Sequence, residues 1–235
     1  MTIASTPDHV AAAVPSIGAA AARWIDHLGG GWVAPAWEEP SSGFATRQAR
    51  FAGGAKLELL EPRSDESFAA RFLDRYGARI HHVTLKVPAL LPAVATLEAA
   101  GLALVDVSAE GGYWHEAFLG PSQVGGLIVQ LAWSKHDDDG WAAAFGTTPQ
   151  PPRPDAAQLL GPRLAHPDLQ AAARVWHLLG AEVARDDEVL TVRWPDAPLD
   201  IEVVAGERAQ PLGLRMAGTA PLPADEIHGP AVLLA

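Results

Sequence analysis

The 235-residue sequence contains no cysteine. Disulfide bridges, thiolate metal ligands and cysteine nucleophiles are therefore excluded, and the composition fits a reducing compartment. No apolar run approaches the roughly 20 residues that a membrane span needs, and the N-terminus lacks the basic region and apolar core of a secretory signal. We therefore expect a cytoplasmic protein with no membrane partner.

Positive charge is also scarce. The chain has 17 Lys and Arg against 28 Asp and Glu, which gives a net charge of −11. Because no dense stripe of Lys and Arg is present, we expect no nucleic-acid partner. Hydrophobic residues make up 49% of the chain, enough to build a core. The length allows one large domain or two smaller ones.

One short pattern occurs twice in the chain. His9-Val10 and His82-Val83 are each followed, after three residues, by Val-Pro. The stretches 8–14 and 80–87 read as strands, the second with clear alternation and β-branched residues. Each is followed by an Ala-rich pattern typical of a helix.

The repeat has a second half with its own polar residue. Glu58 lies in the apolar stretch 56–60, and Gln130 lies in the apolar stretch 127–131. His9 and His82 are 73 positions apart (82 − 9), and Glu58 and Gln130 are 72 apart (130 − 58). A repeat of this length indicates tandem structural modules.

Each module is predicted to be βαβββ. In the first, Ser16 is the expected N-cap of a helix over 16–28, and three glycines follow that helix. Its later strands are expected at 32–37, 44–52 and 55–60. A linking helix over 65–77 precedes the second module, whose helix and strands are expected at 90–100, 102–107, 113–119 and 126–133.

The sequence predicts three regions. Residues 1–134 form a two-module domain, the polar and Pro-rich stretch 135–154 is a linker, and 155–235 form a degenerate third module with a partial fourth. Glu202 lies 72 positions past Gln130 (202 − 130). No histidine occupies the equivalent of His9 there, where the candidates are Leu160, Gly161 and Arg163. We therefore expect the C-terminal region to be non-catalytic.

Two histidines and a carboxylate at matching positions of repeated strands indicate a divalent metal site. Imidazole and carboxylate suit Zn²⁺, Ni²⁺, Co²⁺, Fe²⁺ and Mn²⁺. Bound by His9, Glu58, His82 and neutral Gln130, a divalent ion would carry a net charge of about +1. Such an ion polarises a carbonyl and stabilises an enolate. The structural alternatives are hydrogen-bonded histidines and a glutamate that faces solvent.

Several motifs in this order resemble one superfamily. They are Asp8-His9-Val10, Lys56 to Pro62, Ile80 to Val83, and Glu116 to Pro121 running into Gly126 to Leu131. Together they resemble the vicinal oxygen chelate superfamily of glyoxalase I, methylmalonyl-CoA epimerase, extradiol dioxygenases and bleomycin-resistance proteins. The tract from Leu60 to His82 is especially similar to the epimerase branch.

The resemblance implies an α+β fold in which tandem βαβββ modules form a curved mixed sheet around a divalent metal. By the same resemblance, the ligands are His9, Glu58, His82 and Gln130. Epimerases of this type carry acid/base glutamates where this chain has Thr46 and Gln130. We therefore name Glu116 and Gln130 as candidate catalytic residues, although the strand parity leaves the direction of Glu116 open.

Neighbouring side chains carry weaker signals. Trp114 and His115 face opposite sides of one predicted strand, so that one of them would line the pocket. Arg47 and Arg50 are candidates for binding an anionic group, although surface arginines are commoner. Trp32 and Trp37 are expected to pack in the core or at its rim.

Three functions follow. The first is a metal-dependent lyase or isomerase of the glyoxalase/epimerase type, which chelates neighbouring oxygens of a 2-oxo acid, a hemithioacetal or an acyl thioester. The second is a resistance-type protein that binds a small molecule without turnover. An iron-dependent dioxygenase ranks last, because the dioxygenases of the family take their ligands from later modules. The predicted partners are a small-molecule substrate and a second copy of the chain, in a homodimer.

Overall fold

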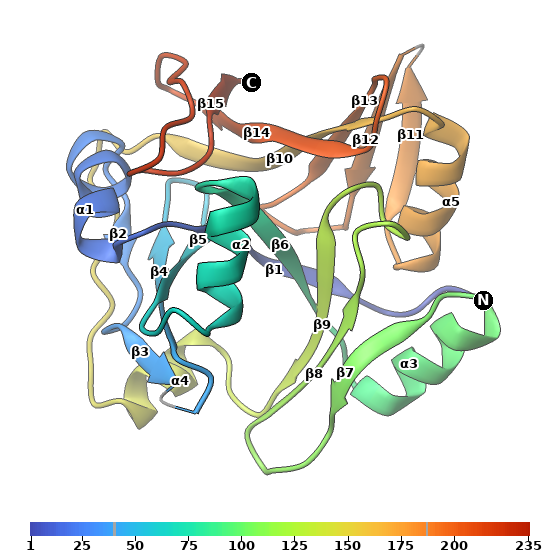
Figure 1. Cartoon of the computed structure of the whole chain (residues 1–235), viewed down its shortest axis with the longest axis horizontal. Coiled ribbons are helices and arrows are strands. Elements are labelled where there is room, and N and C mark those ends of the chain that lie inside the picture. The colour runs from blue at the N-terminus through green and yellow to red at the C-terminus, as the bar shows by residue number, and fades with distance from the viewer. Residues whose placement is uncertain (40, 187) are drawn as a thin grey trace. The chain divides into compact units, whose positions relative to one another are not determined.

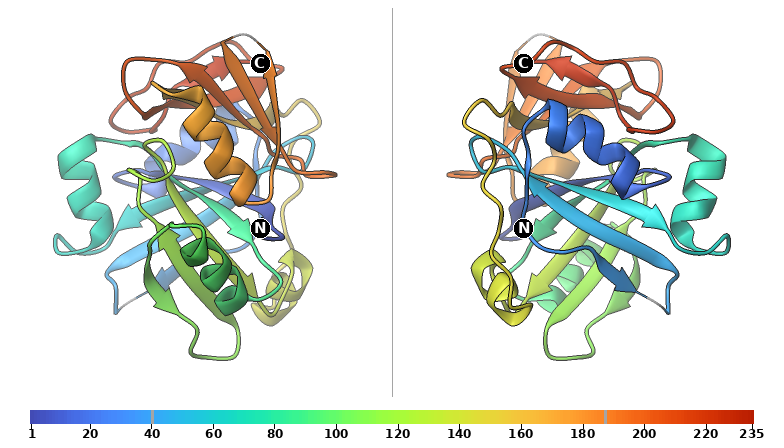
Figure 2. Two further views of the ribbon diagram at one scale, coloured as in Figure 1. Left: turned by 90° about the vertical axis from the view of Figure 1, so that its right-hand side faces the viewer. Right: turned by 90° about the vertical axis from the view of Figure 1, so that its left-hand side faces the viewer.

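The structure is a computed structural model that describes residues 1–39, 41–186 and 188–235. It is a mixed α+β fold, shown in Figures 1 and 2. The chain divides into two compact units, each built from separated stretches of sequence. Unit 1 comprises residues 1–9, 82–136 and 161–212, and unit 2 comprises residues 10–81, 137–160 and 213–235. The predicted division at residues 135–154 stays a prediction.

Among the described residues the βαβββ order is present three times, with the short strands β2 and β3 in place of one strand in the first module. The first module contains β1 (Thr6–Ala13), α1 (Ile17–Ala21), the π-helix η1 (Ala22–His27), β2 (Gly31–Trp32), β3 (Trp37–Glu39), β4 (Phe44–Arg50) and β5 (Lys56–Pro62). After α2 (Phe68–Tyr76), the second contains β6 (Arg79–Lys86), α3 (Leu90–Ala99), β7 (Leu104–Ser108), β8 (Trp114–Leu119) and β9 (Ile128–Ser134).

The C-terminal half begins with α4 (Asp138–Ala144). The third module follows as β10 (Gln158–His166), α5 (Leu169–Leu178), β11 (Glu182–Asp186), β12 (Val189–Arg193) and β13 (Ile201–Ala205). Strands β14 (Gln210–Ala217) and β15 (Val232–Leu234) complete the described elements.

The modules share one pairing scheme. The first strand of each pairs in parallel with the last, as β1 with β5, β6 with β9 and β10 with β13. The later strands pair antiparallel, as β4 with β5, β8 with β9 and β12 with β13. Within unit 1, helix α3 packs on β8 and β9, and α5 packs on β11, β12 and β13 (Figures 1 and 2). Within unit 2, α1 and α2 pack on β5.

The first helix begins where the sequence predicts and then widens. The Ser16 side chain accepts a hydrogen bond from the Ala19 N–H, which confirms it as the N-cap. The helix changes to π geometry from Ala22 to His27, and Gly29 follows at φ +79°. Trp24 is fully buried in this π segment, and its indole donates to the His228 carbonyl at 2.7 Å.

The observed elements differ from the predicted ones at three places. The expected strand over 32–37 is two short strands, β2 and β3. The expected linker contains α4, because Asp137 caps it by accepting from the Gly140 N–H at 2.8 Å. Strand β15 was not predicted, since its short apolar stretch gains strand geometry only by pairing with β14.

Among the described residues, no helix has both the length and the apolar character needed to cross a membrane.

Candidate metal centre

His9 is held in one orientation by its neighbour in the sequence. Its side chain is 2% exposed, and its Nδ1 lies 2.6 Å from the Asp8 carboxylate. A carboxylate on one ring nitrogen fixes the imidazole and leaves the other nitrogen to serve as the ligand, as in many metal sites. The Nε2 atom of His9 lies 2.9 Å from the Thr84 hydroxyl.

His82 lies close to His9 in unit 1. It is 5% exposed, and the two ring centroids are 5.7 Å apart at an interplanar angle of 68°. Residues two apart on a strand share a face. His82 and Thr84 therefore lie on the same face of β6, and both approach His9.

His81 faces the other side of β6. Its ring lies 5.3 Å from that of Phe68 and 4.6 Å from that of Phe72, centroid to centroid. Burial lowers the pKa of His81 to about 4, although the charge of Glu58 acts in the opposite direction. His81 is therefore a neutral imidazole at neutral pH, in contact with aromatic rings.

Gln130 is tied to the same network through both ends of its amide. Its backbone pairs with Thr84 in the parallel ladder of β6 and β9. The Thr84 hydroxyl donates to Gln130 Oε1 at 2.5 Å, and Gln130 Nε2 donates to Glu116 Oε2 at 2.8 Å. The carbonyl end of the amide therefore lies on the Thr84 side.

The structure places Glu116 on the same face of the sheet as Gln130. Phe118 is the antiparallel partner of Gln130, and Glu116 is two residues away on β8. The indole N–H of Trp114 also donates to Glu116 Oε2, at 2.8 Å, and the Lys86 ammonium lies 3.9 Å from the Trp114 ring centroid. A polar chain thus runs from Lys86 to His9.

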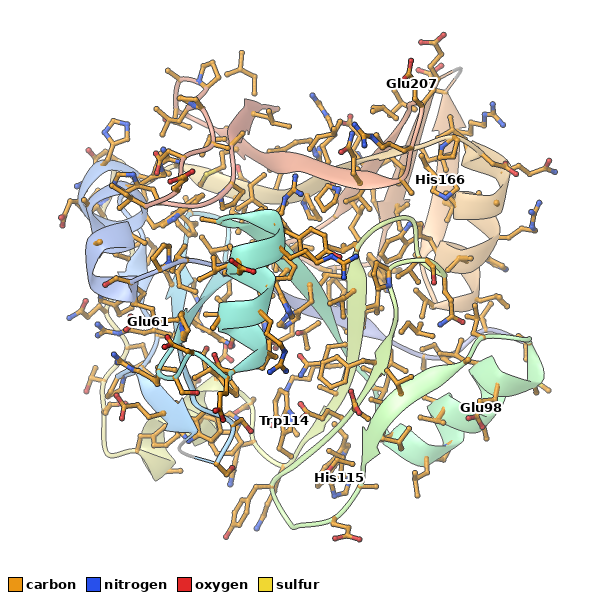
Figure 3. All side chains as sticks on the ribbon, viewed as in Figure 1. Glu61, Glu98, Trp114, His115, His166 and Glu207 are labelled. Carbon is orange, nitrogen blue, oxygen red and sulfur yellow. The ribbon has the colours of Figure 1, made fainter. Side chains whose placement is uncertain are left out.

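His115 lies on the opposite side of β8 from Trp114 (Figure 3). Its Nε2 lies 2.9 Å from the Gly111 carbonyl, and its ring lies 4.6 Å from the Trp133 ring, centroid to centroid. Of the two neighbours named from the sequence, Trp114 is therefore the one on the side of Glu116 and Gln130.

Glu58 is a half-buried carboxylate on β5. Gln48 is its antiparallel partner on β4, and Gln48 Nε2 donates to Glu58 Oε1 at 3.3 Å. Thr46 shares the face of Gln48, because the two are separated by one residue on the same strand. The hydroxyl of Thr46 is therefore on the side of β4 that carries Gln48.

His9 and His82 lie close together in unit 1, and Glu58, the carboxylate predicted with them, lies on β5 in unit 2. Two imidazole nitrogens and one carboxylate are a donor set that first-row divalent metals accept. The two buried histidines, one of them oriented by Asp8, fit such an ion. Gln130 Oε1 and His9 Nε2 both contact the hydroxyl of Thr84.

The arginines named from the sequence have structural contacts in unit 2. Arg47 stacks on Trp32 at 4.2 Å and donates to the Ala34 carbonyl at 3.1 Å. Burial lowers the pKa of the Arg47 guanidinium. Arg50 pairs with Asp138 at 2.6 Å, so that it anchors α4. Trp37 is 44% exposed, which places it at the surface.

The third module has a glutamate but no histidine at the positions that match the metal-type residues. Glu202 pairs in the ladder with Arg163, and the Arg163 guanidinium donates to its carboxylate. The position two residues before Arg163, which corresponds to His9 and His82, is Gly161. A Cβ at Gly161 would lie 1.9 Å from the Asp200 carbonyl oxygen, so that no histidine fits there.

Thr84 and Gln48 contact the predicted site residues but were not themselves predicted. Thr84 was detectable, because it is two residues after His82 on an alternating strand. Gln48 depended on the register of β4 on β5, which the sequence does not show.

The matching family model is that of the glyoxalase/bleomycin resistance protein/dioxygenase superfamily, over residues 8–118. The chain belongs to this superfamily, also called the vicinal oxygen chelate superfamily. It is similar to an ethylmalonyl-CoA/methylmalonyl-CoA epimerase of Cereibacter sphaeroides, with 34% identity over 130 residues that cover 53% of this chain and 94% of the relative.

Two solved structures share the fold. The methylmalonyl-CoA epimerase of Mycobacterium tuberculosis is 25% identical and has a TM-score of 0.52, covering 58% of this chain and 92% of its own. A hypothetical protein of Bacillus halodurans has the same identity and TM-score, covering 57% of this chain and 97% of its own. These matches confirm the superfamily and the α+β fold of βαβββ modules.

Proposed function

We propose that this protein is a metal-dependent isomerase of the epimerase type. It would move a proton at the carbon beside the carbonyl of a small acyl thioester. The observation that carries this proposal is the pair of buried histidines, His9 and His82, in unit 1, in a chain similar to enzymes named as epimerases of acyl-CoA substrates. Members of the superfamily typically use a divalent metal.

The metal would be held by His9, Glu58 and His82, with Gln130 Oε1 as the fourth protein ligand. When bound, it supplies a Lewis acid that stabilises negative charge on the oxygen of an enolate. Asp8 would orient His9, and burial of both histidines would limit the access of water to their ring nitrogens.

Glu116 is the proposed proton acceptor. Trp114 and Gln130 both donate to its Oε2, which holds the carboxylate on the same face of the sheet as Gln130. Inversion at carbon needs a proton carrier on each side of the carbanion. Thr46, on β4, is a much weaker acid and base than a carboxylate. We therefore expect exchange of the α-proton with solvent to be faster than inversion.

A second candidate is binding without turnover. It is favoured by Thr46 and Gln130, which stand where the resemblance to epimerases expects acid/base glutamates. This function predicts that the protein takes up metal and acyl thioester but catalyses no exchange. In either case we propose that residues 155–235 are non-catalytic, because Arg163 and Gly161 replace the metal-type pattern there.

The test measures two quantities, the metal content of the chain and the exchange of the substrate α-proton with solvent. The purified chain is assayed by elemental mass spectrometry and then incubated with methylmalonyl-CoA in D₂O, with deuterium and inversion followed by mass spectrometry and NMR. We expect one divalent ion per chain and exchange that is lost in His82→Ala together with the metal. Glu116→Gln should keep the metal and lose exchange.

His115→Ala is the control, because it removes an aromatic side chain from the opposite side of β8. It should retain metal and exchange. Metal and thioester binding with no exchange would favour the second candidate, and a chain that takes up no metal after reconstitution would contradict both accounts of the metal centre.

A further inference from the structure

In each module, the position directly opposite the metal-type residue on the parallel strand differs. Ala11 pairs with Glu58, Thr84 pairs with Gln130, and Arg163 pairs with Glu202. The three modules thus present a methyl group, a hydroxyl and a guanidinium at one structural position.

The side chain at this position determines which interaction the opposite glutamate or glutamine can make. Arg163 binds the Glu202 carboxylate directly, so that the third module holds an ion pair at this position. The side chain of Ala11 has no polar atom that could bind the Glu58 carboxylate. Thr84 lies between these extremes, because its hydroxyl both donates and accepts.

We propose that Thr84 is a positioning residue that sets the orientation of the Gln130 amide and thereby the metal affinity of the centre. The inference rests on the proposed metal centre. Thr84 contacts two of the proposed metal ligands. Its Oγ1 lies 2.9 Å from His9 Nε2 and 2.5 Å from Gln130 Oε1.

The orientation of the amide follows from the chemistry at its two ends. An ionised Glu116 carboxylate only accepts hydrogen bonds, so that it selects the NH₂ end of Gln130. The Thr84 hydroxyl donates to the carbonyl end. Because Thr84 also contacts His9 Nε2, the carbonyl oxygen is the amide atom on the His9 side. The reversed amide would present NH₂ there, which cannot bind a cation.

Thr84 is suited to hold this arrangement. It has no exposed surface, and its β-branched side chain has few accessible rotamers on a strand. Its Cα is paired with that of Gln130 across the ladder, so that the hydroxyl and the amide are brought together by backbone register.

Thr84→Val is the informative change, because valine keeps the β-branched side chain and replaces the hydroxyl with a methyl group, which cannot form a hydrogen bond. The Kd for Co²⁺ and for Zn²⁺ is measured on the full chain, by absorption of the Co²⁺ complex and by competition with a chelator. We expect the valine variant to bind each metal about tenfold more weakly, the effect typical of groups that orient metal ligands. Thr84→Ser, which restores the hydroxyl, should recover affinity to within about threefold.

Two controls separate this role from a general loss of packing. Thr96→Val removes a hydroxyl that donates to the Pro92 carbonyl on α3, and it should leave the Kd unchanged. In a Gln130→Ala background, Thr84→Val should weaken binding by less than about twofold, because the two residues act as a unit.

Parent-like affinity in Thr84→Val, or no recovery in Thr84→Ser, would overturn the role of the hydroxyl. A full tenfold loss in the Gln130→Ala background would overturn the route through Gln130. A parent chain that binds neither metal would overturn the metal centre and this role with it, which distinguishes the two failures.

Discussion

Residues of one type differ in role because their neighbours differ. His81 and His82 are adjacent in the sequence, yet His81 packs on Phe68 and Phe72, whereas His82 lies beside His9. Glu58 and Glu202 also occupy matching positions, and only Glu202 faces an arginine across the ladder. The residue opposite, rather than the residue itself, therefore separates a candidate ligand from an ion-pair partner.

The pair of Arg163 and Glu202 predicts an asymmetric mutational response. Arg163→Met removes the guanidinium from a carboxylate that is mostly buried, so we expect a loss of about 1–3 kcal/mol in the free energy of unfolding. Replacing both residues with apolar ones should cost much less, since no charge remains in need of a partner. Urea denaturation of the single and double variants measures both values. Equal losses in the two would contradict this account.

Asp225 predicts a pH dependence of stability. Desolvation raises its pKa, but hydrogen bonds from His228 and the Ile227 N–H and the charge of Arg23 outweigh this and lower it to about 2. The pKa of Asp225 in the folded chain is below its ordinary value of 3.8, so that the ionised carboxylate stabilises the fold above about pH 4. This contribution is lost as the pH falls toward 2, because the unfolded chain binds the proton first.

The measurement is thermal unfolding of the parent and Asp225→Asn between pH 2 and pH 7. We expect a lower melting temperature for the variant at neutral pH and a difference that shrinks to nothing near pH 2. The neighbouring exposed Glu226→Gln is the control and should follow the parent. A difference that stays constant across this range would sink the prediction.

At the scale of elements, short-range signals explain the helices and long-range pairing explains the strands. Ser16 and Asp137 each cap a helix through their own side chains. The acidic run that reads as a linker is the first turn of α4, where acids complement the helix dipole. Helix α4 is attached to β4 and β5 through Asp138, whose carboxylate contacts Arg50 and Lys56.

Asp138→Asn is expected to weaken the attachment of α4. Lys56 is 5% exposed, and its ammonium would lose a carboxylate at 2.7 Å. We expect the free energy of unfolding to fall by about 1–3 kcal/mol, with faster hydrogen exchange in residues 138–144. The exposed Asp139→Asn removes the same charge from the same turn and should change stability by less than about 0.5 kcal/mol. Identical behaviour of the two variants would argue against the anchor.

At the scale of the molecule, each compact unit collects stretches that are distant in the chain. Unit 2 brings residues 213–235 together with residues 10–81. There, Arg23 donates to the Pro230 carbonyl at 3.1 Å and pairs with Asp225, and Trp24 donates to the His228 carbonyl. The C-terminal segment therefore completes the surroundings of the first helix.

Removal of residues 219–235 should consequently be costly. It takes away the partners of Arg23 and of the buried Trp24, so we expect a melting temperature lower by more than about 10 °C and a red-shifted tryptophan emission. A chain that ends at Leu233 keeps the segment around Asp225 and His228 and serves as the control. A parent-like melting temperature in the longer truncation would refute the structural role of this segment.

Much of the candidate site was readable from local sequence. His9 repeats as His82 after 73 positions, and Glu58 is matched by Gln130 after 72 positions. Alternation along each strand is likewise a local property that short stretches carry by themselves. Helix starts were equally accessible, because a capping side chain acts within three residues. The module order βαβββ followed from these two signals and from the glycines between them.

What remained hidden depends on register and on contacts between distant segments. The face of Glu116 required the alignment of β8 on β9, and the meeting of Thr84 with Gln130 required that of β6 on β9. Strand β15 depends on pairing with β14, and Arg23 contacts the Pro230 carbonyl, 207 positions away in the sequence. A shift of one residue in any ladder reverses every side chain on it, so that these features exist only once the whole fold has formed.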